Sequence, residues 1–378
     1  MRAVRARCAA AAVLVSFVCI AVHAHDEEAA AAARIPQRVA LLQRAQAELE
    51  RGDAPAALDD FERAAMMLHA ADAELGLIRA AMQDGQYRRA LAFCAHTAGE
   101  HTDDADGAAL YAWLLRIGGQ GALATRVIAD ARTLAPGDAV AAAADAALAG
   151  PFPVASGTLL APPHRMAPWP VMLAGQVPPP ASARFAGNAT LVGGGSAALV
   201  PLAALGPAPH GRLWVRNGLG QASEAIVMPG DRTLSEHGLA LLARSATLPP
   251  GGSRQAVGRA PFGGSPGYAL AFAPGSAPAW PLLSQGFLGN PLGDGEVRKL
   301  GFASDPGAPV LDRQGALVGI AVGAVGAQAT WLPLAALAST WAQPEAAAVS
   351  APQASGLVAP DAIYESGLRR ALQVLVAD

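Results

Sequence analysis

Apolar residues recur with a period of about 3.6 from Pro36 to Leu148, with almost no internal proline, and this pattern predicts helices over residues 35–149. From Arg184 to Ala338, short apolar runs alternate instead with Gly/Pro turns, which is typical of a β-barrel or a β-sandwich. The runs are Thr190–Val192, Leu213–Val215, Ala225–Met228, Leu239–Leu242, Tyr268–Phe272, Val310–Leu311 and Leu317–Val322. The pattern alone does not decide between barrel and sandwich.

The helical half contains an internal repeat. Gly52, Gly85 and Gly119 lie 33 and 34 residues apart. The positions five, nine and twelve residues after each glycine match from unit to unit: Ala57, Ala90 and Ala124; Phe61, Cys94 and Ile128; Ala64, Thr97 and Ala131. The spacing resembles that of the tetratricopeptide repeat, and this resemblance implies that each glycine turns the chain between two helices and that the small residues let these helices pack closely.

On these residues the region resembles the tetratricopeptide repeat, which implies three helix pairs with Ala139–Leu148 as a capping helix. Glu48 and Glu74 depart from the family pattern. Stacked repeats form a concave surface that binds a peptide or a partner helix. An irregular helical bundle, and repeats that serve only as a spacer, stay open as alternatives.

Two proline-rich segments separate the parts of the chain. Residues 150–183 are predicted to be an extended linker, anchored by Trp169 and Met172, and residues 342–358 a flexible Ala/Pro linker. After Pro360 we expect a C-terminal helix within residues 359–378, with one apolar face formed by Ile363, Tyr364, Leu368, Leu372 and Leu375. Packing of this helix on the β half is favoured over docking to a partner or to the repeat groove of the same molecule, because an exposed apolar stripe is costly.

Residues 1–24 have the features of a secretory signal peptide. Arg2, Arg5 and Arg7 precede an apolar run from Cys8 to Val22, and cleavage is expected near Ala24. We therefore expect a periplasmic or secreted protein without a membrane span. Removing this segment leaves 24 basic and 30 acidic residues, a balance that argues against nucleic acid as a partner. Cys94 would be the single remaining cysteine, so no internal disulfide is expected.

Residues 302–323 (FASDPGAPVLDRQGALVGIAVG) are similar to the nucleophile loop of trypsin-like serine proteases, which runs Gly-Asp-Ser-Gly-Gly-Pro into two strands. Asp305, Gly307 and Pro309 keep the frame, but Pro306 stands where the catalytic serine belongs. Proline supplies neither a nucleophile nor a backbone N–H. In the template, the N–H of the nucleophile is one of two oxyanion-hole donors.

The resemblance extends over most of residues 184–341. Gly187–Val192 is similar to the strand that opens HtrA-like domains, and Ala198–Leu205 to the segment that carries the catalytic histidine. The histidine position is then Ala203, and Gly238, before Leu239–Leu242, occupies the aspartate position. The resemblance implies a trypsin-like double β-barrel in which all three triad positions, Ala203, Gly238 and Pro306, are degenerate.

A displaced active site is the alternative. Ser304 and His237 lie near two of the degenerate positions, and Gly263–Gly267 matches the G-x-S-x-G elbow around Ser265. That elbow uses the N–H of the residue after serine, which is Pro266 and has none.

The remaining cysteine and histidine side chains are expected to have structural roles or none, rather than catalytic or metal-binding ones. We interpret Cys94 as an inert core thiol. His69, His96 and His101 lack metal-ligand spacing and are interpreted as surface or helix-end residues. No metal and no cofactor is expected.

The sequence therefore predicts an α + β multidomain protein, a helical superhelix followed by an all-β double barrel. We expect a pseudoprotease that binds a protein or peptide through the repeat groove and the barrel cleft. A serine endopeptidase with a non-standard site is the competing hypothesis.

Overall fold

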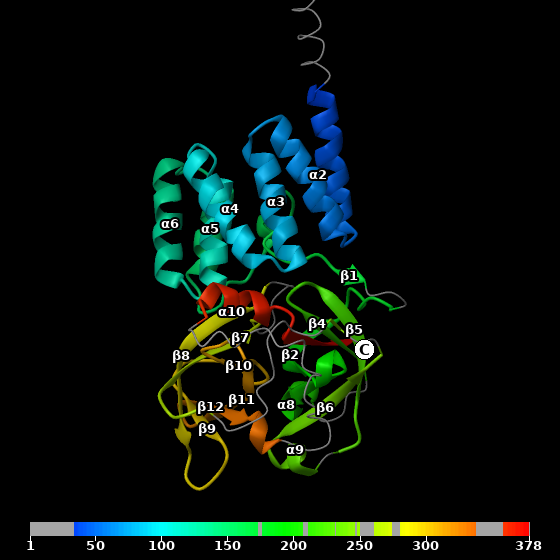
Figure 1. The fold of residues 1–378 in the computed structure, drawn as a ribbon, viewed down its shortest axis with the longest axis vertical. Coiled ribbons are helices and arrows are strands. Elements are labelled where there is room, and N and C mark those ends of the chain that lie inside the picture. The colour runs from blue at the N-terminus through cyan, green and yellow to red at the C-terminus, as the bar shows by residue number, and fades with distance from the viewer. Residues whose placement is uncertain are drawn as a thin grey trace, which may run out of the picture.

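The computed structural model describes residues 34–172, 176–206, 211–230, 232–245, 248–249, 261–273, 280–337 and 358–377. A layer of helices lies over two β-barrels (Figure 1). The predicted helical region followed by a double barrel is thereby confirmed. The predicted signal peptide and residues 342–357 of the predicted linker lie outside the described residues.

The helical region consists of three antiparallel pairs and a closing helix. Residues 34–50 pair with α2 (Ala54–Met67), α3 (Ala71–Asp84) with α4 (Tyr87–Glu100), and α5 (Ala105–Ile117) with α6 (Gly121–Leu134); α7 (Ala139–Leu148) follows. Gly52, Gly85 and Gly119 stand in the turns within the pairs with φ of 82°, 83° and 83°, which favours glycine because it has no Cβ. The predicted glycine turns are therefore present.

Small residues bring neighbouring helices into close contact. A Cβ added at Gly76 of α3 would lie 2.2 Å from the ring of Phe61 in α2. Phe61, Cys94 and Ile128, the larger residues of the repeat, are all buried. The sequence pattern therefore identified the residues that fill the seams between the helices.

The barrels share one strand order. The second closes through β7 (Ser265–Ala271), β8 (Leu282–Pro291), β9 (Arg298–Leu300), β12 (Gln328–Pro333), β11 (Leu317–Val325) and β10 (Pro309–Asp312). The first closes through β13 (Ala371–Ala377), β2 (Arg184–Val192), β3 (Ala197–Pro201), β6 (Leu239–Arg244), β5 (Gln221–Val227) and β4 (Arg212–Asn217). The six strands of each barrel can be numbered 1 to 6 along the chain, with β7 as strand 1 of the second barrel and β13 taken as strand 1 of the first, before β2. Both rings then have the neighbour order 1-2-3-6-5-4.

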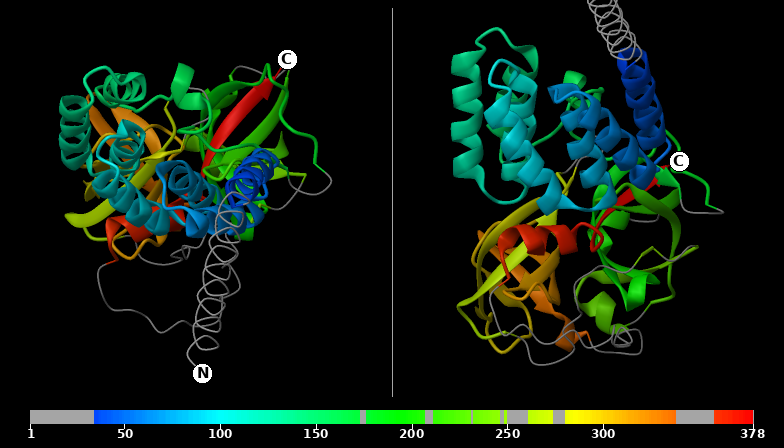
Figure 2. Two further views of the ribbon diagram at one scale, coloured as in Figure 1. Left: turned by 90° about the horizontal axis from the view of Figure 1, so that it is seen from above. Right: turned by 45° about the horizontal axis from the view of Figure 1, so that its top comes forward.

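The predicted C-terminal helix is wrong beyond its first two turns. α10 (Pro360–Gly367) is helical, but residues 371–377 form β13, which pairs with β2 on one side and β4 on the other. Leu372 and Leu375 therefore lie on a strand, not on a helix face. The strand closes the first barrel with residues nearly 180 positions after β2, and Figure 2 shows it running between the strands of that barrel. The C-terminal segment is thus an internal part of the fold.

The glycine turns face the barrels. A Cβ added at Gly52 would lie 3.1 Å from Val171 of β1 (Val171–Met172), and one at Gly85 would lie 3.3 Å from Leu219, between β4 and β5. At Gly119 it would lie 3.2 Å from the carbonyl oxygen of Leu283 in β8. The row of turns therefore rests on both barrels.

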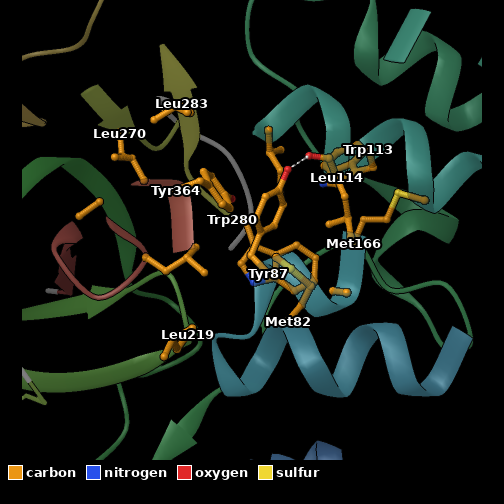
Figure 3. Close-up of a cluster of buried hydrophobic side chains, with 14 of the residues drawn as sticks. Met82, Tyr87, Trp113, Leu114, Met166, Leu219, Leu270, Trp280, Leu283 and Tyr364 are labelled. Atoms are coloured by element: carbon orange, nitrogen blue, oxygen red, sulfur yellow. Dashed lines mark hydrogen bonds between the residues drawn. The ribbon is translucent and has the colours of Figure 1, made fainter. Parts of the chain in front are cut away.

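A continuous apolar core joins the layers (Figure 3). The rings of Tyr87 in α4 and Tyr364 in α10 pack against each other with centroids 4.4 Å apart, beside Trp280 and Leu283 of the second barrel. None of the helices in the described part of the chain is long and apolar enough to cross a membrane.

Candidate functional site at the barrel junction

The segments that carry the three positions predicted for a catalytic triad, Ala203, Gly238 and Pro306, meet where the barrels touch. Ala203 lies in α8 (Leu202–Leu205), directly after β3, and Gly238 directly precedes β6. The N–H of Leu202 donates to the carbonyl of Gly238 at 2.8 Å, so these two segments are adjacent.

The loop that holds Pro306 reaches this point from the second barrel. The hydroxyl of Thr190 in β2 donates to the carbonyl of Gly307 at 2.9 Å. Gly307 has φ of 92°, and a Cβ there would lie 1.9 Å from the carbonyl oxygen of Asn188 and 3.0 Å from Pro201. Only glycine fits this contact, which brings the loop before β10 against β2 and β3.

Asn188 holds the two barrels together at the same place. Its side-chain carbonyl accepts the N–H of Phe272 at 2.7 Å, and its side-chain amide donates to the Phe272 carbonyl at 3.2 Å. The residue is buried, and Phe272 directly follows β7 of the second barrel. The junction is therefore fixed by hydrogen bonds between the barrels.

The side chains at the three positions cannot transfer protons. Ala203, Gly238 and Pro306 are all exposed at the surface, and none carries a nucleophile, a base or an acid. Nucleophilic catalysis needs a nucleophile and a base within hydrogen-bond reach.

The loop backbone does not supply an anion site at residues 306–308. Pro306 has no N–H. The N–H of Gly307 donates to the Ala321 carbonyl at 2.8 Å, and that of Ala308 to the Asp305 carbonyl at 3.2 Å. An oxyanion hole requires N–H groups that are free to meet the developing charge. All the N–H groups of this stretch are already used.

Ser304 is not arranged as a substitute nucleophile. Its hydroxyl oxygen is buried and has no hydrogen-bond partner among the described residues, so no base contacts it. The same holds for Oδ2 of Asp305, and burial raises the pKa of this carboxyl. His237, beside Gly238, is half-buried, and its N–H donates to the Leu234 carbonyl.

Ser265 lies in the wrong structural context for a nucleophile elbow. It begins strand β7 and pairs with Leu288 in an antiparallel ladder. An elbow needs a strand-to-helix turn. The literal G-x-S-x-G match is therefore part of a β-strand.

One strand edge beside Pro306 is unpaired. β11 pairs with β10 from Leu317 to Ile320, and Ala321 exchanges hydrogen bonds with Gly307 and Ala308. Residues 322–325 continue past this ladder; Val322 lies in a bulge, and residues 323–325 pair only with β12 among the described strands. A Cβ added at Gly323 would lie 3.9 Å from the Pro306 ring, so this free edge borders the junction.

The inner face of the helical region is already covered. Eleven of the 14 residues of α3 and nine of the 13 residues of α5 are buried, against four in α4 and three in α6. The cover is the proline-rich segment 150–172, whose buried residues are Pro153, Ala155, Leu159, His164, Met166, Ala167, Pro168 and Trp169.

Specific contacts fix this segment on α3 and α5. The N–H of Trp169 donates to Oε1 of Gln83 at 2.6 Å, and the guanidinium of Arg79 lies 5.5 Å from the Trp169 ring. Burial lowers the pKa of Arg79 to about 9. His164 Nδ1 lies 3.3 Å from Oδ2 of Asp106 in α5. The expected anchor Trp169 is therefore present, but the expected open repeat groove is filled by the chain itself.

His69 and His96 are exposed and His101 is the C-cap of α4, as expected of surface or helix-end residues. The expectation that they lack metal-ligand partners is wrong, because all three gather around the buried carboxylate of Glu74. Sequence reasoning missed this cluster because its members come from two helices and a connection. Cys94 is fully buried and burial raises the pKa of its thiol, as expected of a core residue.

No protein-family model matches the chain, and no curated protein matches it. Over 44% of its length the chain is similar, at 21% sequence identity and a TM-score of 0.33, to the MamO protease domain from Magnetospirillum magneticum in its apo form, of which it covers 97%. It is also similar over 40% of its length, at 18% identity and a TM-score of 0.33, to the HtrA-type protease AlgW with a decapeptide. The chain spans about half, 49%, of that second protein.

Proposed function

We propose that this chain is a non-catalytic member of the trypsin-like fold that binds an extended polypeptide at the junction of its barrels. The observation that carries the proposal is the loop at Pro306. It offers no nucleophile and no free N–H over residues 306–308, and it faces segments whose side chains cannot act as a base or an acid. The barrel junction thus lacks the groups that catalysis needs, while the strands around it are present.

Binding is assigned to the free edge of β11. An extended peptide can add a strand to an unpaired edge through main-chain hydrogen bonds, and this needs no catalytic side chain. Residues 322–325 are half-buried or exposed and border Pro306, so a peptide paired there would lie across the degenerate positions.

We propose that the helical region consists of three tetratricopeptide-like units. Their inner face packs on segment 150–172 and so serves a structural role. The 33- and 34-residue spacing and the left-handed glycine turns support this assignment. Because segment 150–172 occupies the inner face of α3 and α5, a second peptide would have to displace it. We therefore place the partner site on the barrel edge.

Export is proposed from the N-terminal sequence. The three arginines and the apolar run before Ala24 are the features of a signal peptide, and the mature protein would act in the periplasm or outside the cell.

Fluorescein-labelled, reduced and carboxymethylated casein tests the function, since it presents extended polypeptide. We expect saturable binding in fluorescence anisotropy, intact casein after overnight incubation, and slower amide exchange at residues 322–325 when casein is bound. Exchange at β9, on the other side of β12, is the internal control and should not change. Cleaved casein would support the displaced-nucleophile peptidase, and absent binding would overturn the proposed binding role.

A further inference from the structure

Three histidines meet at one buried carboxylate at the end of the helical layer remote from the barrels. His69 lies between α2 and α3, Glu74 in the first turn of α3, His96 just before the last turn of α4, and His101 at the C-cap of α4. α3 and α4 are antiparallel, so the start of one and the end of the other lie together. The glycine turn at their other end contacts the barrel.

The possible metal-ligand atoms of these four residues, the histidine Nε2 atoms and the Glu74 carboxylate oxygens, lie close together. His69 Nε2 is 2.7 Å and His96 Nε2 is 3.5 Å from Oε1 of Glu74, and His101 Nε2 is 3.5 Å from Oε2. The Nε2 atoms of His69 and His96 are 3.1 Å apart. Donor atoms of His69, Glu74 and His101 all lie within 4.8 Å of one another.

Hydrogen bonds alone cannot provide a partner for every nitrogen in this cluster. An imidazole Nε2 carries at most one hydrogen, and that of His69 faces both Glu74 and His96. His101 Nε2 is buried and makes no hydrogen bond among the described residues. A cation at the centre would accept a lone pair from every histidine and would neutralise a carboxylate whose side chain is only 5% exposed. We propose that His69, Glu74, His96 and His101 bind one divalent transition-metal ion, with zinc as the best fit.

The ligand set and spacing favour zinc. Imidazole nitrogens and a carboxylate oxygen are zinc ligands at about 2.0–2.2 Å, which places the donors of a tetrahedral site about 3.3–3.6 Å apart. The Nε2 atoms of the three histidines lie 2.7–3.5 Å from the Glu74 carboxylate, and those of His69 and His96 are 3.1 Å apart, close to these values. The ligand atoms of His69, Glu74 and His101 lie within 4.8 Å of one another, so these three form the core of the site and His96 would complete it after a side-chain movement. Thr97, fully buried, donates from Oγ1 to Oε2 of Glu74 at 2.7 Å and orients the carboxylate from behind, as outer partners of metal ligands do.

Four protein ligands make a closed, structural site. The metal would tie the connection between α2 and α3 to the end of α4, and so join the first helix pair to the second. An ion that binds only the folded state raises stability by mass action.

Cobalt binding to the full chain, prepared without a histidine tag and freed of metal by EDTA and dialysis, tests the proposal. We expect the visible absorption of tetrahedral cobalt, saturating at one ion per chain and abolished by zinc. We also expect zinc to raise the midpoint of thermal unfolding.

Variants locate the site. His69→Ala, at an exposed residue, and Glu74→Gln, which keeps the side-chain shape, should each weaken cobalt binding at least about 10-fold, and circular dichroism checks that both fold. His237→Ala, in the barrel half, is the matched control and should bind like the parent. No tetrahedral cobalt spectrum from the parent chain, or unchanged affinity in the His69→Ala/Glu74→Gln double variant, would overturn the proposal and leave a hydrogen-bonded cluster.

Discussion

The ring of Tyr87 in α4 packs against that of Tyr364 in α10 in a tilted arrangement, with ring centroids 4.4 Å apart and ring planes inclined by 56°. Both hydroxyls donate at 2.8 Å, Tyr87 to the carbonyl of Leu114 and Tyr364 to that of Pro281. α10 then leads directly into β13. One C-terminal segment therefore contacts the helices, borders the second barrel and completes the first.

Removal of the Tyr364 ring should loosen this three-way contact. Tyr364→Ala deletes a fully buried aromatic side chain, and we expect a loss of about 3–5 kcal/mol in the free energy of unfolding. Urea unfolding followed by circular dichroism measures it. Phe287→Ala, at a side chain that is 62% exposed, is the control and should change stability by less than about 0.5 kcal/mol.

Alkaline pH should destabilise the fold through the same pair. Burial raises the pKa of both Tyr87 and Tyr364 above the ordinary value of 10.0. Above pH 10 the unfolded chain therefore loses protons that the folded chain keeps, and the free energy of unfolding falls by up to about 1.4 kcal/mol per pH unit for each tyrosine. Urea midpoints measured from pH 8 upward should show this slope, and Tyr87→Phe should reduce it. An equal slope in that variant would contradict the assignment.

The first barrel should depend on the last residues of the chain. Leu372 is fully buried in β13 between β2 and β4, so Leu372→Ala should cost about 2–5 kcal/mol. A chain that ends at Arg370 loses the whole strand, and its first barrel should be open to limited proteolysis in β2 and β4. Ordinary protease resistance of the truncated chain would show that the barrel closes without β13.

Segment 150–172 should stabilise the helical region by filling its inner face. Trp169→Ala removes a buried indole together with its contact to Arg79, and we expect a loss of about 3–5 kcal/mol. Faster amide exchange in α3 is the specific readout, because α3 lies directly under this segment. If stability falls but exchange in α3 does not change, the segment has only a general packing role.

Patterns of neighbouring residues were enough to predict the helix turns and most of the strands. The glycine spacing marked the three helix turns, and the apolar runs marked most strands of the barrels. The run from Leu368 to Leu375 was misread because β13 is buried on both faces, which removes the alternation that distinguishes a half-buried strand from a helix.

The rest depends on contacts between distant residues. Pairing of β13 with β2 and β4 joins the two ends of the β half and has no local signature. The hydrogen bond between Trp169 and Gln83 also has no local signature in the sequence. Neither does the proposed metal site, whose ligands His69 and His101 lie 32 residues apart. The assignment of Ala203, Gly238 and Pro306 to triad positions is a prediction from a family resemblance, and the structure adds that the N–H groups of Gly307 and Ala308 are already used.

The central claim is that the barrel junction has no catalytic nucleophile, and a fluorophosphonate serine probe read by intact mass tests it most directly. Neither the parent chain nor Pro306→Ser should form an adduct under conditions that label trypsin completely, because the positions predicted for the base and the orienting acid are Ala203 and Gly238, which carry neither. A stoichiometric adduct on the parent chain would contradict the account, and the modified serine would identify the displaced active site.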